Sequence, residues 1–127
     1  MLFKTAITEM FGIEYPVICG AMMWLCKPRF CAAVSNAGGM GNLTAGNYET
    51  EEEFRAAIAE TRRLTDKPFM VNITLLPSVR ITPEHHKMYI RVCTEERVSG
   101  IEFSGTPVDK VAGMAAIEDL KRAGVKL

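Results

Sequence analysis

Short apolar runs alternate along the chain with longer segments in which apolar residues recur every three or four positions. The short runs are typical of buried parallel strands, and the longer segments are typical of amphipathic helices. We expect strands at residues 17–19, 40–43, 69–74 and 101–103, and the start of a fifth at 125–127. The helices expected between them cover residues 28–36, 51–64, 83–97 and 108–123. This alternation predicts an α/β fold of about four βα repeats with a parallel sheet.

Local signals mark where two of these helices begin. Thr50 is followed three positions later by Glu53, which is the spacing of a capping box. Thr82 precedes Pro83, and proline is favoured in the first helical turn. The glycine-rich segment 36–41 follows a predicted helix and lacks the spacing of a nucleotide-binding loop. We interpret it as a structural turn.

The length of the chain decides between two α/β architectures. A complete (β/α)8 barrel takes roughly 250 residues, and this chain has 127. The pattern therefore predicts the N-terminal half of a TIM (β/α)8 barrel, a single partial domain over residues 1–127 that stops at the start of the fifth strand. The alternative is a small open doubly wound sheet, in which the last strand would be very short.

Charge and hydropathy exclude several function classes. Fifteen basic and fifteen acidic residues give a net charge of zero, whereas nucleic-acid-binding modules usually carry a basic excess. No apolar run approaches the roughly 18 residues that span a bilayer. Residues 1–12 contain Lys4 and Glu9 and lack the long apolar core of a signal peptide. We expect a cytoplasmic protein that binds neither nucleic acid nor membrane.

The cysteines and histidines do not show the spacing of a metal site. None of the four cysteines forms a Cys-x-x-Cys pair, and the two histidines, His85 and His86, are adjacent. We expect free thiols, no bound metal, and at least one surface histidine. Cys19 follows a predicted strand without a nearby histidine, which favours a buried thiol over a nucleophile.

Ligands of βα folds bind in the loops that follow the carboxyl ends of the strands. The first such loop begins with the small residues Gly20 and Ala21 and continues with Met22, Met23 and Trp24. Small residues let the backbone approach a flat ligand. The alternative is that the large side chains plug the mouth of the barrel.

A second candidate loop follows the strand at 69–74. Asn72 and Thr74 are two positions apart and therefore lie on the same face of that strand. Two polar side chains on an interior face are costly unless they form hydrogen bonds. A polar ligand, the backbone or water would provide them. The loop at 104–106 is a weaker candidate, because its composition is also typical of a simple turn.

Three ordered motifs give the sequence a family resemblance. They are residues 16–22 (PVICGAM), 32–41 (AAVSNAGGMG) and 64–73 (LTDKPFMVNI). With these motifs, residues 3–127 resemble the N-terminal part of the nitronate monooxygenase family, formerly called 2-nitropropane dioxygenases. Two positions depart from the family pattern. Cys19 stands where many members have Gln, and Met70 stands where Gly is usual.

The resemblance implies an FMN-dependent oxidoreductase with a TIM-barrel fold. In the family, the loop that matches Ala21, Met22 and Met23 lies against the flavin ring, and the positions that match Asn72 and Thr74 help to hold FMN. Family members oxidise alkyl nitronates with O2 to carbonyl compounds and nitrite.

The resemblance leaves the catalytic residues of the reaction unassigned in this chain. The family's catalytic histidine is expected beyond Leu127, the last residue of the sequence. The resemblance therefore implies that the chain is inactive by itself.

Two alternatives to nitronate oxidation stay open. Close relatives of the family reduce quinones with NADH, or reduce enoyl thioesters. A non-catalytic half barrel would instead pair with a second copy through its open sheet edges, which zero net charge would not oppose. For the enzyme, the expected partners are a small-molecule nitronate and O2. For the module, the expected partner is a second copy of the chain, which gives a homo-oligomer.

Overall fold

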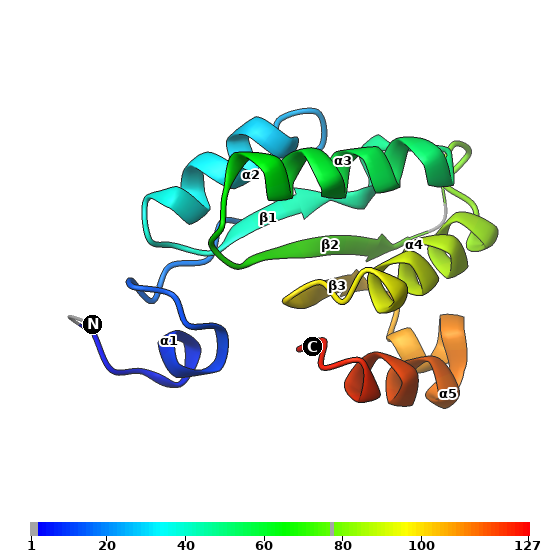
Figure 1. Cartoon of the computed structure of the whole chain (residues 1–127). Coiled ribbons are helices and arrows are strands. Elements are labelled where there is room, and N and C mark those ends of the chain that lie inside the picture. The colour runs from blue at the N-terminus through cyan, green and yellow to red at the C-terminus, as the bar shows by residue number, and fades with distance from the viewer. Residues whose placement is uncertain (1–2, 77) are drawn as a thin grey trace.

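The computed structural model describes residues 3–76 and 78–127 (Figure 1). Its elements confirm the predicted alternation of strands and helices. In chain order they are α1 (Ala6–Phe11), α2 (Pro28–Asn36), β1 (Gly41–Thr44), the 3-10 turn η1 (Ala45–Asn47), α3 (Glu51–Leu64), β2 (Phe69–Leu75), α4 (Pro83–Glu95), β3 (Gly100–Gly105) and α5 (Val108–Arg122).

The strands form one parallel sheet in the order β1-β2-β3. Single parallel bridges, Ile18 with Met40 and Gly100 with Lys126, extend it at both edges. The expected first and fifth strands are present as these bridges alone, and Leu127 follows the second bridge without joining the sheet. Strand order therefore follows chain order, as in the wall of a (β/α)8 barrel, and does not reverse as in a doubly wound sheet.

Helices cover the outer face of the sheet, where α2, α3 and α4 lie along the strands (Figure 1). Phe54 of α3 and Tyr89 of α4 pack edge to face, with ring centroids 5.1 Å apart. Burial of such apolar surface is the main stabilising term of the fold. The fully buried side chains of this layer include Leu43, Phe54, Ile58, Val71, Ile73, Leu75, Tyr89, Val92 and Leu120.

The short helix α1 closes the amino end of the sheet, and it was not expected from the sequence. Its partly buried Ile7 and Phe11 pack against Ile13, Met40 and Met70. The helix begins with a capping box in which threonines at positions 5 and 8 exchange hydrogen bonds. Because the usual Glu or Gln is missing from the box, the sequence contains little sign of this helix.

Two expected helices differ in detail. The helix expected over 108–123 is interrupted at Gly113, whose φ of 79° and ψ of 165° are not helical. A single continuous helix was therefore wrong for this segment. Helix α4 ends at Glu95 and not at Arg97, because Arg97 takes a left-handed backbone conformation with φ of 49°.

The segment 36–41 has the structural role expected of it. Gly38 has φ of +94°, and a β-carbon there would lie 2.9 Å from the ring of Tyr15. A β-carbon on Gly41 would lie 2.1 Å from the carbonyl oxygen of Cys31. Gly41 thus allows α2 to pack closely on β1, and Gly38 allows the turn between them to pass close to Tyr15.

Candidate functional site

Polar side chains lie on the inner face of three neighbouring strands. This face is the one opposite the helices, since successive side chains of a strand alternate between faces. The register pairs Thr44 with Asn72, Asn72 with Glu102, and Thr74 with Ser104. The polar inner face consists of Asn42 and Thr44 on β1, Asn72 and Thr74 on β2, and Glu102 and Ser104 on β3.

The two residues expected on this face, Asn72 and Thr74, contact each other. The Thr74 hydroxyl donates to Oδ1 of Asn72 at 3.1 Å, and it lies 3.0 Å from the hydroxyl oxygen of Ser104. Asn72 is buried, Ser104 is half-buried and Thr74 is exposed. The hydroxyls of Thr74 and Ser104 therefore form the rim of the inner face, where a ligand can reach them.

Deeper on the same face, Asn42 and Glu102 form a pair that sequence reasoning missed. The Asn42 amide nitrogen donates to Oε2 of Glu102 at 2.5 Å and to the carbonyl oxygen of Cys19 at 3.2 Å. One signal could have found the pair. The spacing polar-x-polar occurs on all three strands, as Asn-Leu-Thr at 42–44, Asn-Ile-Thr at 72–74 and Glu-Phe-Ser at 102–104.

The loop with Ala21, Met22 and Met23 is fastened to the carboxyl end of β1. The Thr44 hydroxyl donates to the carbonyl oxygen of Met22 at 3.4 Å. The backbone N–H of Trp24 donates to Oδ1 of Asn47 at 2.7 Å. The Arg80 guanidinium lies 4.6 Å from the centroid of the Trp24 ring, a cation–π contact. These contacts place the loop at the mouth of the half barrel.

A cavity of about 190 Å³ brings two of the predicted site residues together. Met23 and Thr74 both line it, together with Thr44 of β1 and Tyr89 of α4. Small-molecule sites usually have about 300–1,000 Å³. The cavity is thus large enough for part of such a ligand.

The same edge of the sheet exposes large apolar side chains. Met22, Met23 and Trp24 are 42%, 45% and 61% exposed. Ala21 is half-buried at the start of the loop. A β-carbon on Gly20 would meet no atom within 4 Å, so there is open space above this backbone. Contiguous exposed apolar surface marks a contact site for a ligand or a partner.

The thiols near this loop are not activated nucleophiles. Cys19 and Cys26 both donate to the carbonyl oxygen of Gly20, at 3.4 and 3.6 Å. Burial raises the pKa of the Cys19 thiol and raises that of Cys31 to about 12. Since the thiolate is the reactive form, Cys19 and Cys31 carry little of the reactive form at neutral pH. All four cysteines are free.

The two histidines of the chain lie outside this face, on α4. His85 has a local role, because its Nδ1 accepts from the backbone N–H of Thr82 at 3.1 Å and caps the helix. His86 is buried, and His85 is half-buried. Neither belongs to the polar inner face, and the catalytic histidine expected beyond Leu127 stays a prediction.

Over residues 3–76 and 78–127, no three His, Cys, Asp or Glu side chains gather as metal ligands would. In this part of the chain no helix is long and apolar enough to cross a membrane.

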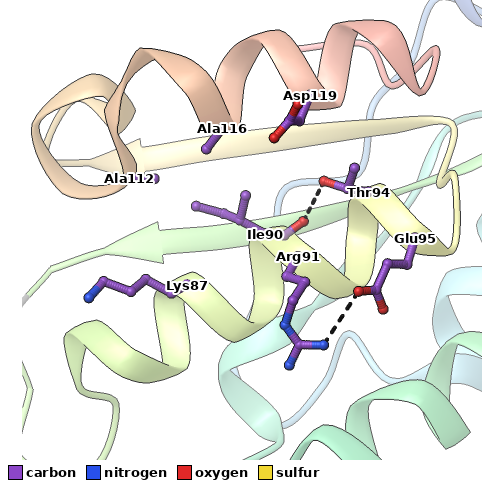
Figure 2. A pocket seen from close by; sticks show the side chains of 8 residues that line it. All are labelled: Lys87, Ile90, Arg91, Thr94, Glu95, Ala112, Ala116 and Asp119. Atoms are coloured by element: carbon purple, nitrogen blue, oxygen red, sulfur yellow. Dashed lines mark hydrogen bonds and ion pairs between the residues drawn. The ribbon is translucent and has the colours of Figure 1, made fainter.

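A larger groove of about 370 Å³ lies between α4 and α5 (Figure 2). Figure 2 shows Lys87, Arg91 and Glu95 along one side and Ala112 and Ala116 along the other. This groove belongs to the outer layer of helices. It contains none of the predicted site residues.

Parallel strands in chain order, with polar side chains at their carboxyl ends, define the wall of a barrel whose ligand site lies at its mouth. Nitronate monooxygenase is the family whose model matches residues 4–121. The chain therefore belongs to the nitronate monooxygenase family of flavin-type oxidoreductases. This match confirms the family resemblance seen in the sequence.

Individual relatives include enzymes with different names. A (3aS,4S,5R,7aS)-5-hydroxy-7a-methyl-1-oxo-octahydro-1H-indene-4-carboxyl-CoA dehydrogenase of Rhodococcus jostii (strain RHA1) is 46% identical over 122 residues, which are 96% of this chain and 31% of that protein. A nitronate monooxygenase of Pseudomonas aeruginosa is 47% identical over 66 residues, 52% of this chain and 18% of that protein. The chain thus spans at most about a third of these relatives.

Solved structures of TIM-barrel proteins confirm the fold prediction. FabK from Thermotoga maritima superposes with a TM-score of 0.81 at 35% identity, over 98% of this chain and 36% of that one. Nitroalkane oxidase from Streptomyces ansochromogenes superposes with a TM-score of 0.74 at 26% identity, over 95% of this chain and 41% of that one.

Proposed function

We propose that the chain forms the flavin-facing part of an FMN-dependent oxidoreductase. One observation carries the proposal: an exposed apolar loop and a polar inner face meet at the carboxyl end of the sheet. Met23 and Thr74 represent the two surfaces and line the same cavity. A flavin needs both surfaces, because its ring system is flat and largely apolar while its pyrimidine edge and side chain are polar.

The residues present fit this cofactor. Met22 and Met23 offer apolar surface to the ring, and Ala21 and the open space at Gly20 let the backbone come close to it. The exposed Thr74 hydroxyl can bond to the polar edge, with Asn72 beneath holding its orientation at 3.1 Å. When bound, FMN supplies the transfer of electrons from the substrate to an acceptor.

The first candidate reaction is the oxidation of an alkyl nitronate with O2 to a carbonyl compound and nitrite. The match to the nitronate monooxygenase family over residues 4–121 supports it. In this reaction the residues of this chain would bind and orient the cofactor and the substrate. The thiols of Cys19 and Cys31 would not act as nucleophiles, because their raised pKa values keep them protonated at neutral pH. We place the catalytic histidine beyond Leu127 and expect no turnover from residues 1–127 alone.

The second candidate reaction is the oxidation or reduction of a CoA thioester. The likeness to the Rhodococcus CoA dehydrogenase runs over 96% of this chain, against 52% for the Pseudomonas nitronate monooxygenase. Of the two departures from the family pattern, Cys19 lies at the site, where its carbonyl oxygen accepts from Asn42. Met70 packs against α1 at the amino end of the sheet.

Binding of FMN tests the proposal directly. We would titrate FMN with the purified chain and follow quenching of flavin fluorescence. Met23→Glu should weaken binding by at least about tenfold, a loss of roughly 1.4 kcal/mol, because it charges the apolar surface. Met10→Glu is the matched control, since Met10 is 48% exposed and lies on α1, at the other end of the sheet.

Flavin binding separates the enzyme from the non-catalytic module, and turnover separates the candidate substrates. Saturable FMN binding that Met23→Glu weakens and Met10→Glu leaves intact supports the flavin site. A self-associated chain that takes up no flavin overturns it and favours the non-catalytic module. For the substrate, nitrite release from a nitronate in air is compared, in a full-length protein, with turnover of a CoA thioester and with NADH-dependent quinone reduction.

A further inference from the structure

Glu102 is a carboxylate on the inner face of the sheet. It lies half-buried on β3, two positions before Ser104. Within residues 3–76 and 78–127, no ion pair includes it. A carboxylate in such a place is costly unless hydrogen-bond donors surround it. Its surroundings therefore indicate what it binds.

The donors near Glu102 all approach one of its two oxygens. The side-chain nitrogen of Asn42 donates to Oε2 at 2.5 Å. The side-chain nitrogen of Asn72 lies 3.4 Å from Oε2, and equally far from the backbone oxygen of Glu102 and the Ser104 hydroxyl. The second hydrogen of Asn42 goes to the carbonyl oxygen of Cys19 at 3.2 Å. Oε2 is thus fixed by two amides, and Oε1 is left to accept from elsewhere.

A second acceptor in the same cluster is also unsatisfied. Asn42 is fully buried, and its Oδ1 has no hydrogen-bond partner among the residues that the structure describes. The rim hydroxyls of the same face are already engaged, because Thr74 donates to Asn72 at 3.1 Å and lies 3.0 Å from the hydroxyl oxygen of Ser104. The donors of the cluster are used and its acceptors are free. The group that complements it is consequently a hydrogen-bond donor.

We propose that Glu102, held in place by Asn42 and Asn72, accepts a hydrogen bond from the N–H of the flavin pyrimidine ring. The inference rests on the proposed function, because it requires FMN at this edge of the sheet. That N–H is the one donor of the oxidised ring system, and it lies between two carbonyl groups. Glu102 is next to Ser104 on the same face, so it meets a ligand that reaches the rim hydroxyls.

Glu102→Gln reverses the polarity of this contact without changing its shape. The amides of Asn42 and Asn72 would hold the Gln oxygen in the place of Oε2. The Gln amide nitrogen would then stand in the place of Oε1, where its N–H would face the N–H of the flavin pyrimidine ring. Loss of a bond to a charged acceptor is among the larger hydrogen-bond effects. We expect the dissociation constant for FMN to rise about tenfold or more.

The probes are FMN and 3-methyl-FMN, in which a methyl group replaces the N–H. The unmodified chain should bind FMN at least about tenfold more tightly than 3-methyl-FMN, because only FMN can donate to Glu102. Glu102→Gln should abolish this preference. Glu118→Gln, at an exposed position of α5, should preserve it. The comparison of the two flavins on the unmodified chain needs no variant, so equal binding of both overturns the role of Glu102 even if Glu102→Gln fails to fold.

The outcomes for the two proposals differ. If the unmodified chain binds neither flavin, the proposed function fails and this inference fails with it. If it binds both flavins equally, or if Glu102→Gln keeps the preference for FMN, the flavin site stands and the role of Glu102 is overturned. The inference is supported if the unmodified chain and Glu118→Gln both prefer FMN to 3-methyl-FMN and Glu102→Gln does not.

Discussion

The backbone N–H of Gly41 donates to the hydroxyl oxygen of Ser35 at 3.2 Å, and that hydroxyl donates to the carbonyl oxygen of Pro68 at 2.9 Å. One buried side chain thus joins α2 to the start of β1 and to the residue before β2. The approach is so close that a β-carbon on Gly41 would lie 2.6 Å from the Ser35 oxygen.

Gly41→Ala should therefore destabilise the fold. The new methyl group has to displace backbone as well as the Ser35 hydroxyl, and overpacking of this kind costs about 1–3 kcal/mol or more. The measurement is the free energy of unfolding in urea. Gly20→Ala is the control, because a β-carbon there meets nothing within 4 Å. Equal losses in the two variants would contradict the packing argument.

Removal of the cap of α3 should also lower stability. The Thr50 hydroxyl accepts from the backbone N–H of Glu53 at 3.2 Å, and the Glu53 carboxylate accepts from the N–H of Thr50 at 3.2 Å. Thr50→Ala removes the first bond and should cost about 1 kcal/mol in urea unfolding. Thr50→Ser keeps the hydroxyl and should stay close to the unmodified chain. A loss as large in Thr50→Ser would show that the hydrogen bond is not the cause.

Stability should depend on pH through His86. Burial lowers the pKa of His86 below its ordinary value of 6.5, and the neighbouring His85 lowers it further, against a rise caused by the backbone of Thr74. Below pH 6.5 the unfolded chain then binds more protons than the folded chain. Stability consequently decreases as the pH falls from 6.5 toward the folded-state pKa.

Urea midpoints at several pH values between about 7 and 5 measure this dependence. His86→Gln should remove the part of the decrease that comes from His86, whereas His85→Gln should keep most of it, because burial is the larger cause of the lowered pKa. An unchanged pH profile in His86→Gln would contradict the assignment.

Alkylation should rank the cysteines by exposure. Cys19 is half-buried, whereas Cys26, Cys31 and Cys93 are buried. With iodoacetamide, mass spectrometry of peptides should show Cys19 modified first and the other three modified only after unfolding in urea. Burial also raises the pKa of Cys31 to about 12, so its thiolate is scarce in the folded chain. Early modification of Cys93 would contradict this order.

The sequence predicted best what local signals determine. The helices at 28–36 and 51–64 begin and end where expected, because a proline at the start of one and a capping box in the other act within a few residues. Helix α1 escaped prediction because its stability comes from Met40 and Met70, which are distant in the chain.

The site was predictable in the same partial way. Asn72 was expected on an inner face, and the structure puts it there beside Thr74. Its contacts with Asn42 and Glu102 depend on the register of three strands, which a single sequence does not reveal. The roles of Ala21, Met22, Met23, Asn72 and Thr74 as FMN contacts stay predictions.

The strand order has a consequence for how the chain is made. Each strand pairs with the one synthesised just before it, so β2 docks on β1 and β3 docks on β2. No strand of this sheet has to wait for a later one to fill a gap between neighbours. As the chain leaves the ribosome, N-terminal residues first, the strand with which each new βα unit pairs has already been synthesised. The sheet can thus grow in the direction of translation.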